Sequence, residues 1–292
     1  MYNYLAVKDT IFKSNITLNC KGKLIEFDTP IIMGIVNTTP DSFYKGSRNK
    51  SIEDALEITK QFVKQGVDII DVGGYSSRPG AQEINELEEL NRVIPVIKAI
   101  KHHFPDLIIS IDTFRPKVAR LALIEDADII NDISGGQFDT SIFKVASEFS
   151  APYIMMHMRG TPKNMQSKTQ YKHLIKTLIL FFSKQIKMAQ NFGVKDIIVD
   201  PGLGFSKTLE QNYDIIKHLD LFNVLDKPIL VGASRKSMLY KFLDITPDES
   251  LNATSIINTI ALTNGAHILR VHDVREAMEL KKIFTFLNRT IE

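Results

Sequence analysis

The sequence has little of what marks a secreted, membrane-bound or nucleic-acid-binding protein. Its 292 residues include one cysteine, Cys20, which excludes an intramolecular disulfide and suits the reducing cytoplasm. The 36 basic and 34 acidic residues leave a net charge of +2, so we expect neither nucleic acid nor a membrane surface as a partner. The start, MYNYLAVKDTIFKSN, has no apolar core after a basic segment, and LILFFS at 178–183 is too short to cross a bilayer. We therefore expect a soluble cytoplasmic enzyme or binding protein.

Several short motifs are also missing. Neither H-x-x-x-H nor C-x-x-C occurs, which argues against a zinc site held by the protein. Magnesium remains compatible, because it often keeps few protein ligands and enters with a phosphorylated substrate, and Asn37 and Asp41 offer candidate oxygens. The first apolar run, IIMGIVN at 31–37, leads into TTPDSF without G-x-G-x-x-G, which disfavours a doubly wound dinucleotide-binding sheet.

What the chain does have is a repeated pattern of short apolar runs that end in polar or glycine residues. Eight such runs predict buried strands, at 31–37, 69–74, 107–113, 129–135, 153–160, 197–202, 229–235 and 268–273. Segments with helical spacing follow them, at 52–66, 84–104, 116–126, 141–149, 173–192, 208–222, 250–264 and 274–288. Pro95 interrupts the second of these segments, and we expect a break or kink in the helix there.

This alternation of strands and helices predicts a single α/β domain over residues 1–292. Eight strand–helix units in roughly 250 residues are typical of a (β/α)8 TIM barrel. No linker or shift in composition divides the chain, and the alternation in KLIEF predicts a β-hairpin within residues 1–30 that closes the bottom of the barrel formed by residues 31–288. In such barrels the carboxyl ends of the strands build the active site.

The polar residues at the ends of the predicted strands offer two kinds of chemistry. Asp112, Asn131 and Asp200 provide carboxylates and an amide, which suit the donor edge of a flat nitrogenous ring. Donors and positive charges that suit phosphate or carboxylate come from other strand ends, namely Asn37, Ser76, Ser77, Arg78, Arg235, Lys236, Ser237, Arg270 and His272. The pattern predicts a substrate with a nitrogenous ring at one end and an anion at the other.

Several of these residues also have ordinary structural interpretations. Asp112 suits the cap of the helix that begins near Pro116, and Asp71 suits a structural hydrogen bond inside its strand. His157, between two methionines, is typical of a core histidine, and Lys236 suits a solvated position at a helix start. Arg270 and His272 are harder to explain in this way, because residues two apart in a strand point to the same side.

The motifs taken together resemble a known family. In order, GIVNTTPDSF, DVGGYSSRPG, SIDTFRP, INDISG, MHMRGTP, DPGLGF, VGASRKS and LRVHDV resemble the bacterial dihydropteroate synthases of folate biosynthesis, from about residue 31 to residue 288. The resemblance implies a transferase that joins 7,8-dihydropterin-6-ylmethyl diphosphate to 4-aminobenzoate, giving 7,8-dihydropteroate and pyrophosphate, usually with Mg²⁺. It also implies a homodimer and inhibition by sulfonamides, which mimic 4-aminobenzoate.

The resemblance implies a role for each matching residue. The pterin pocket would contain Asp112, Asn131, Met156, Asp200, Phe205, Gly232 and Lys236. The diphosphate end would contain Asn37, which is also the candidate Mg²⁺ ligand, with Ser77, Arg270 and His272. The aminobenzoate site would contain Phe43, Arg78, Pro79 and Ser237. The expected catalytic residues are Asp112, Asp200, Lys236, Arg270 and His272.

The two loops that carry NTTPDSF and YSSRPG are expected to border the active site, and three rival functions stay open. The segment NTTPDSF is expected to fold over the site as a lid, with Phe43 closing on the aminobenzoate and excluding water from a cationic intermediate. The second loop departs from the family pattern G-G-E-S-T-R-P-G, because Tyr75 replaces the acidic residue and Ser77 the threonine. The rivals are a pterin-dependent methyltransferase, a Schiff-base aldolase using Lys236, and a non-catalytic pterin-binding relative in which Tyr75 has disabled the loop.

Overall fold

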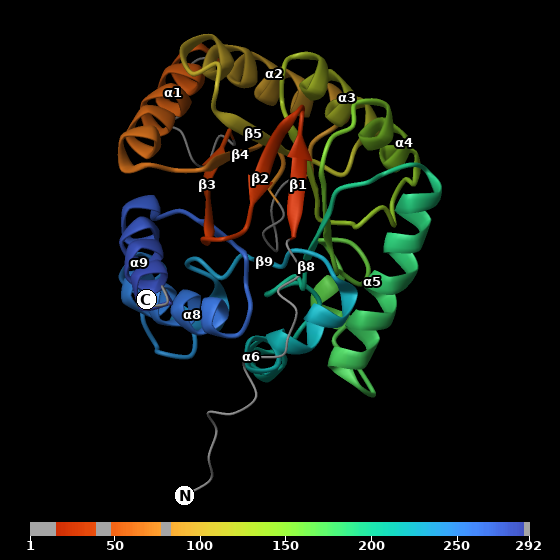
Figure 1. Cartoon of the computed structure of the whole chain (residues 1–292), viewed down its shortest axis with the longest axis vertical. Coiled ribbons are helices and arrows are strands. Elements are labelled where there is room, and N and C mark those ends of the chain that lie inside the picture. The colour runs from red at the N-terminus through yellow and green to blue at the C-terminus, as the bar shows by residue number, and fades with distance from the viewer. Residues whose placement is uncertain (1–15, 39–47, 77–82, 289–292) are drawn as a thin grey trace, which may run out of the picture.

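A computed structural model describes residues 16–38, 48–76 and 83–288 and shows a parallel barrel surrounded by helices (Figure 1). The eight parallel strands are β3 (Ile31–Asn37), β4 (Ile69–Gly73), β5 (Ile108–Asp112), β6 (Ile129–Asp132), β7 (Tyr153–Met156), β8 (Ile197–Asp200), β9 (Leu230–Val231) and β10 (Ile268–Val271). They pair in the order β8-β7-β6-β5-β4-β3-β10-β9. A parallel bridge between Val199 and Ile229 brings β8 to β9 and closes the ring. The predicted (β/α)8 barrel is confirmed.

The helices that surround the strands follow the predicted segments closely. Their bounds are α1 (Arg48–Gln65), α2 (Glu86–His103), α3 (Pro116–Ile124), α4 (Ser141–Glu148), α5 (Leu174–Asn191), α6 (Leu209–Lys217), α8 (Leu251–Thr263) and α9 (Val274–Leu287). A short helix, α7 (Ser237–Tyr240), follows β9, and 3-10 turns lie at η1 (Met165–Ser167), η2 (Leu219–Leu225) and η3 (Asp248–Ser250). The predicted helix at 208–222 therefore ends as an α-helix at Lys217 and continues as a 3-10 turn.

Helix α2 runs through Pro95 as one continuous element, so the prediction of a break there is wrong. The pyrrolidine ring removes one backbone donor from the helix. The turns on both sides of Pro95 nevertheless bury Val93, Val96 and Ile97 completely or almost completely against the core. Burying three such side chains stabilises the helix by more than the roughly 3 kcal/mol that an interior proline costs.

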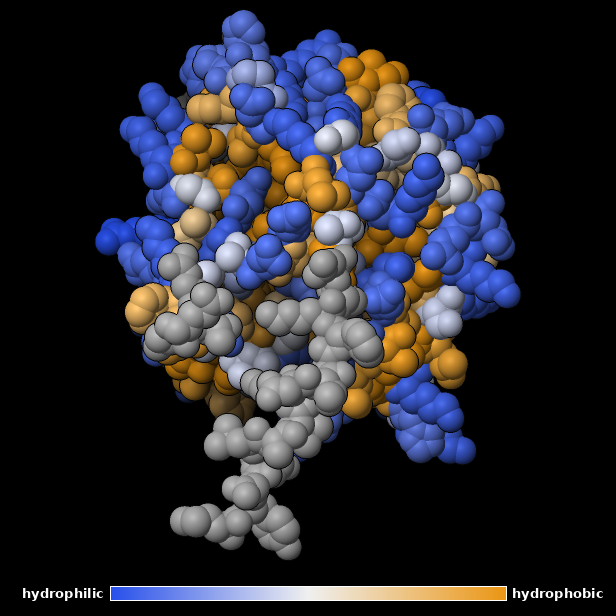
Figure 2. Space-filling view, in the orientation of Figure 1, coloured by the Kyte–Doolittle hydropathy of each residue, from blue (hydrophilic) through white to orange (hydrophobic). Residues whose placement is uncertain are grey.

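An antiparallel hairpin, β1 (Thr17–Cys20) and β2 (Lys23–Glu26), covers the amino-terminal end of the barrel, as predicted. Lys21 and Gly22, both at positive φ, form its two-residue turn. Leu18 and Cys20 pack in one apolar cluster with the first residues of the barrel strands, including Ile31 and Met33. Figure 2, in the same orientation, shows hydrophilic and hydrophobic residues interspersed on this face. In the described part of the chain no helix is long and apolar enough to span a membrane.

Candidate active site

The barrel places the three predicted ring-binding residues at the same end of β5, β6 and β8. Asp112 ends β5 and lies opposite Asn131 of β6 in the parallel register. Asp200 ends β8 and lies opposite Met156 of β7. Asn131 and Asp200 are buried, and Asp112 is partly buried. The three residues predicted for the ring edge therefore lie at the same, carboxyl-terminal end of the barrel.

Arg270 of β10 links two carboxylates of this cluster. Its Nε donates to Oδ2 of Asp71 at 2.6 Å, and its Nη2 donates to Oδ2 of Asp112 at 2.8 Å. The same oxygen of Asp71 accepts the side-chain amide N–H of Asn131 at 3.1 Å. Asp112 is therefore an ion-pair partner, and its interpretation as a helix cap is wrong, because Arg115 holds the cap position of α3. Asp71 takes the structural role that its place inside β4 suggested.

Burial and charge act against each other on these groups. Burial raises the pKa of Asp112 to about 7, although the guanidinium of Arg270 acts in the opposite direction. Burial also raises the pKa of Asp200, against the effects of Lys236 and of the Gly202 N–H. Burial acts to lower the pKa of the Arg270 guanidinium. The negative charges of Asp71 and Asp112 outweigh this effect, and the pKa is raised. The site thus combines a permanent cation with one carboxyl group, that of Asp112, whose charge depends on pH near neutrality.

Lys236 extends into the mouth and is not the solvated lysine of the ordinary interpretation. Its Nζ donates to the carbonyl oxygen of Leu203 at 2.5 Å and lies 4.9 Å from the ring centroid of Phe205. Burial lowers the pKa of this amine to about 8, although Asp200 favours the charged form. Gly232 lies beside it, because a Cβ built there would come within 3.9 Å of Nζ. A Cβ at this position would be in ordinary van der Waals contact with the lysine and with Cβ of Arg270.

An apolar wall adjoins the polar cluster. Met156 and Phe205, both predicted for the pterin pocket, share a buried cluster with Ile133, Met158 and Met165, and the partly buried Phe114 packs against it. Flat aromatic surfaces and polarisable methionine side chains suit contact with the face of a planar ring. The mouth therefore has a wall for the face of a ring beside groups for its edge.

The expected anion end draws on β3 and on the loops after β9 and β10. Asn37 ends β3 beside Gly73 of β4 and is half-buried. Ser234 contacts His272 twice: its Oγ accepts the backbone N–H of His272 at 3.2 Å and lies 3.1 Å from Nδ1 of the ring. Ser237, expected at the aminobenzoate site, begins α7 and is half-buried. The expected residues Phe43, Ser77, Arg78 and Pro79 lie outside the described residues.

Lys207 is a buried residue near the site that the sequence did not point to. Its Nζ donates to the carbonyl oxygens of Gly202 and Phe205, both at 2.9 Å, and lies 3.2 Å from Nδ1 of His157. Burial lowers the pKa of Lys207 well below its usual value and, with Lys207 nearby, lowers that of His157 to about 2. His157 is thus a neutral core histidine, as predicted, and Lys207 joins the loops that follow β7 and β8.

Tyr75, which departs from the family pattern, is packed on the loop after β5. Its ring meets that of Phe114 edge-on, with centroids 5.2 Å apart, and the guanidinium carbon of Arg115 lies 5.6 Å from the centroid of the Tyr75 ring. Arg115 is in turn paired with the buried carboxylate of Glu89. Burial raises the pKa of Tyr75, with a further contribution from Glu83. The aromatic ring therefore has its own partners where the family pattern has an acidic side chain.

Comparison with known proteins identifies the family. Residues 33–272 match the model of the family described as pterin binding enzyme, so the chain belongs to that family. A dihydropteroate synthase of Synechocystis sp. is 46% identical over 255 residues, which are 86% of this chain and 88% of that protein.

Solved structures agree with this assignment. A Yersinia pestis dihydropteroate synthase in complex with a sulfonamide drug has a TM-score of 0.87 and 36% identity over 93% of this chain and 99% of its own. A Xanthomonas albilineans dihydropteroate synthase with 4-aminobenzoic acid has a TM-score of 0.87 and 31% identity over 94% and 98%. The resemblance stated from the motifs is confirmed, and within the family these relatives are dihydropteroate synthases.

Proposed function

We propose that this chain is a transferase that condenses 7,8-dihydropterin-6-ylmethyl diphosphate with 4-aminobenzoate to give 7,8-dihydropteroate and pyrophosphate in folate biosynthesis. The observation that carries the proposal is the single barrel mouth in which Asp112, Asn131 and Asp200 lie beside the cations of Lys236 and Arg270. This arrangement matches a substrate with a donor-rich ring and an anionic leaving group. The family and its synthase relatives support the same reaction.

In this proposal the pterin ring lies against Met156 and Phe205, with its edge on the buried polar groups. Asp112 and Asp200 accept hydrogen bonds from the amino-pyrimidine edge, and Asn131 adds an amide that is held in place by Asp71. Lys236 donates to an acceptor on the ring, and Gly232 leaves room for it. A carboxylate that is buried loses hydrogen bonds to water. A hydrogen bond from the pterin edge replaces part of what is lost.

Binding of the pterin edge also has a consequence for Arg270. In the structure the Nη2 of Arg270 donates to Asp112, the carboxylate that is proposed to bind the ring. A ring that competes for Asp112 weakens this contact, whereas the contact with Asp71 persists because Asp71 lies away from the ring inside β4. The released donor then serves the diphosphate together with His272 and, beyond the described residues, Ser77.

The reaction itself needs charge stabilisation rather than a covalent enzyme intermediate. The C–O bond between the pterin methylene and the diphosphate breaks, and the aniline nitrogen of 4-aminobenzoate attacks the resulting pterin cation and then loses a proton. Arg270 and His272 act where negative charge grows on the leaving group, and Asp112 and Asp200 favour the cationic ring. Removing one such group typically costs about 2.7–4 kcal/mol of barrier.

Magnesium is the proposed cofactor, with Asn37 as its protein ligand. Among the described residues no group of three His, Cys, Asp or Glu side chains could hold a metal ion, which does not suit an all-protein cage. The half-buried amide of Asn37 at the end of β3 does suit an ion that brings water and substrate oxygens with it. When bound, Mg²⁺ would supply positive charge to the leaving diphosphate.

The aminobenzoate site is proposed from Ser237, at the start of α7, and from Phe43, Arg78 and Pro79 outside the described residues. The first-loop lid, with Phe43, belongs to this part of the proposal. Because a relative of known structure binds a sulfonamide drug and another binds 4-aminobenzoic acid, we propose that sulfonamides compete with 4-aminobenzoate here as well.

The chain is also proposed to act as a cytoplasmic homodimer. The free, buried Cys20 suits a reducing compartment. Ile256 and Ile260 lie one turn apart on α8 and are 53% and 41% exposed, and Phe242 and Leu243, after α7, are also exposed. Apolar side chains concentrated at α7 and α8 suit a face that a second copy covers.

A coupled assay on purified protein tests the function. Dihydropterin diphosphate, 4-aminobenzoate and Mg²⁺ are supplied, and dihydropteroate and pyrophosphate are both measured. We expect equal release of the two products, reduced by about 100-fold or more in Asp200→Ala and Lys236→Ala. The exposed Asp220→Ala and Lys187→Ala serve as matched controls and keep wild-type activity.

A different outcome of this assay, together with two further measurements, would identify the rivals. Pterin binding without turnover would identify a non-catalytic relative. Borohydride trapping of a carbonyl substrate on Lys236 would identify an aldolase, and methyl transfer to a corrinoid would identify a methyltransferase.

A further inference from the structure

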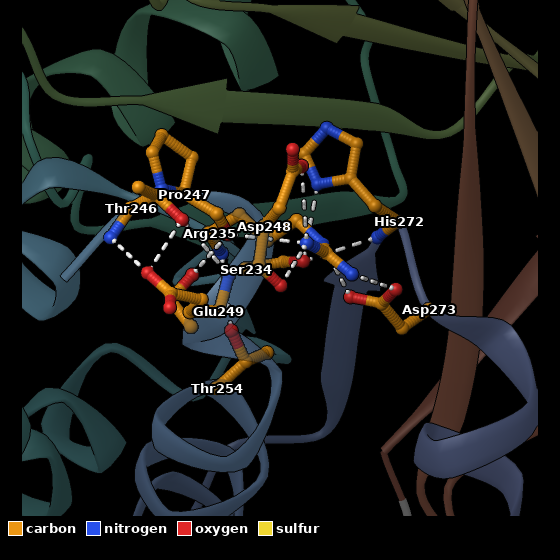
Figure 3. A network of polar contacts seen from close by, with 10 residues as sticks. Ser234, Arg235, Thr246, Pro247, Asp248, Glu249, Thr254, His272 and Asp273 are labelled. Carbon is orange, nitrogen blue, oxygen red and sulfur yellow. Dashed lines mark hydrogen bonds and ion pairs between the residues drawn. The ribbon is translucent and has the colours of Figure 1, made fainter.

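Arg235, directly before Lys236, has a backbone conformation that residues other than glycine rarely adopt. Its φ is +51°, in the left-handed region, where a residue other than glycine is uncommon. Such a conformation persists when the surrounding contacts hold it. Figure 3 shows that Arg235 lies at the centre of a polar network that joins three segments of the chain.

The contacts of Arg235 explain how it is held. Its Nε and Nη2 donate to the two carboxylate oxygens of Asp273, at 2.9 and 2.8 Å. Its Nη1 donates to the carbonyl oxygens of Pro247 and Asp248, at 3.1 and 3.0 Å, and its backbone N–H donates to Oγ1 of Thr254 at 3.1 Å. A two-point pairing of this kind fixes both distance and orientation, which a lysine would not do. The guanidinium is thus engaged by Asp273 and by the carbonyl oxygens of Pro247 and Asp248, and the backbone N–H of Arg235 by Thr254 of α8.

Arg235 and Asp273 each stand next to a residue that is proposed to bind substrate. Arg235 precedes Lys236, which is proposed to bind the pterin ring, and Asp273 follows His272, which is proposed to bind the diphosphate. The Oγ of Ser234 makes a second connection between the same two loops through the backbone N–H and Nδ1 of His272. The loops after β9 and β10 are therefore joined at two points, Ser234 to His272 and Arg235 to Asp273, in the two residues that directly precede Lys236.

We propose that Arg235 and Asp273 are a positioning pair that fixes the placement of Lys236 relative to His272, and so aligns the leaving diphosphate with the bound pterin. The inference rests on the proposed roles of Lys236 and His272. Neither member of the pair touches substrate. Ion-pair geometry matters here because a displacement of about 1 Å far from the chemistry can cost about 100-fold in rate.

The test compares Arg235→Gln, Arg235→Lys, Asp273→Asn and the double variant Arg235→Gln/Asp273→Asn with the wild type. Arg275→Gln is the matched control, because Arg275 pairs with Glu279 on the solvent-exposed side of α9, with 72% and 59% of the side chains exposed. Measurements are kcat, both KM values, the affinity for the pterin alcohol that lacks the diphosphate, and the melting temperature.

We expect kcat to fall by about 100-fold in Arg235→Gln and in Asp273→Asn, with a much smaller change in affinity for the pterin alcohol. The double variant should be no slower than the slower single variant, because both substitutions break one unit. Arg235→Lys should recover part of kcat, since it keeps the charge and loses the two-point geometry. The control should match the wild type.

A purely structural pair would give a different result. Loss of melting temperature with kcat close to that of the wild type in the folded fraction would overturn the proposal, as would additive losses in the double variant. If Arg235→Gln fails to fold, the near-isosteric Asp273→Asn decides the question on the same measurements. Failure of the wild type to form dihydropteroate would refute the proposed function, whereas an active wild type with equally active variants would refute the positioning pair alone.

Discussion

Arg270 of β10 binds Asp71 of β4, with Nε 2.6 Å from Oδ2, and the contact bridges the two strands that flank β3. The side chain of Asp71 is completely buried, whereas that of Asp112, the second partner of Arg270, is 17% exposed. The two carboxylates therefore have different roles. Asp71 is a fixed counter-ion for Arg270, and Asp112 is the partner that a ligand at the mouth can reach.

Replacement of Asp71 by asparagine tests this division of roles. Asp71→Asn keeps the shape of the side chain but leaves Asp112 as the only carboxylate paired with Arg270. The ion pair between Arg270 and Asp112 then becomes stronger, and the pterin must compete with it for Asp112. We expect affinity for the pterin alcohol to fall by about 10-fold or more, the scale of one hydrogen bond to a charged group. The melting temperature should also fall, since a broken buried ion pair typically costs about 3–5 kcal/mol. Calorimetric titration measures the affinity, and an unchanged value in folded protein would contradict the assigned roles.

The pH dependence of kcat/KM for the pterin substrate should be bell-shaped. Asp112 must be ionised to bind the ring edge, and its raised pKa of about 7 places the acid limb near neutrality. Lys236 must be protonated to donate, and its lowered pKa of about 8 makes activity fall as pH rises above that value. kcat/KM reports the groups of the free enzyme.

Two variants and one ligand identify the limbs of this profile. Asp112→Asn should remove the acid limb, and Lys236→Arg should move the alkaline limb to higher pH because arginine stays protonated. The diphosphate also ionises, so the affinity of the pterin alcohol measured over the same pH range separates enzyme groups from substrate groups. A flat profile for the alcohol would show that neither group controls binding.

The fold could be predicted from the sequence because its signal is local. Each Ile/Val-rich run, such as IISID at 108–112, is buried on both faces and ends where a helix or loop begins, so the runs mark the barrel strands. The ends of parallel strands meet at one edge, so Asp112, Asn131 and Asp200 could be assigned to one mouth. The break predicted at Pro95 is absent, because the packing of α2 on the core, which is not visible in the local sequence, keeps the helix continuous.

The electrostatics of the site could not be predicted in the same way. Arg270 and Asp71 are 199 residues apart in sequence, and no local pattern says which carboxylate pairs with which cation. Lys207 follows DPGLGF at a position typical of a solvated loop lysine, and its burial among carbonyl oxygens depends on the loops after β7 and β8. The Arg235–Asp273 pair is likewise formed between two loops, each ordinary when considered alone.

Replacement of Asn37 should change the requirement for magnesium rather than the affinity for pterin. In Asn37→Ala we expect a higher Mg²⁺ concentration for half-maximal activity, because one of few protein oxygens near the diphosphate is lost. Affinity for the pterin alcohol should stay close to that of the wild type. A Mg²⁺ titration after removal of metal by EDTA measures the effect, with the exposed Asn191→Ala as control. Equal Mg²⁺ requirements in Asn37→Ala and the control would exclude Asn37 as the ligand.

Lys207→Met should destabilise the loops that frame Asp200. The substitution keeps much of the volume but leaves the carbonyl oxygens of Gly202 and Phe205 without the donor they have now, at about 1–3 kcal/mol for each such group. The exposed Lys184→Met is the control. Denaturant unfolding measures the free energy, and pterin affinity should fall with it.

The pH dependence of this difference has a definite sign. The pKa of Lys207 is lower in the folded than in the unfolded chain, so the folded state binds the proton less tightly. The stability of the wild type relative to Lys207→Met should therefore rise as pH increases from the lowered pKa towards the usual lysine value of 10.5. A difference that falls with pH over that range would contradict the assignment.

Introducing negative charge on the exposed face of α8 should dissociate the proposed dimer into single chains. Ile256→Asp/Ile260→Asp places two carboxylates where a partner would bury apolar side chains, and unpaired buried charges are strongly unfavourable. Light scattering after gel filtration should give twice the chain mass of 33.0 kDa for the wild type and that mass once for the variant. Leu180→Asp on α5, where Leu180 is 60% exposed, is the matched control and should remain dimeric. A wild type that elutes as a single chain, or a variant that stays a dimer, would show that this face is not the interface.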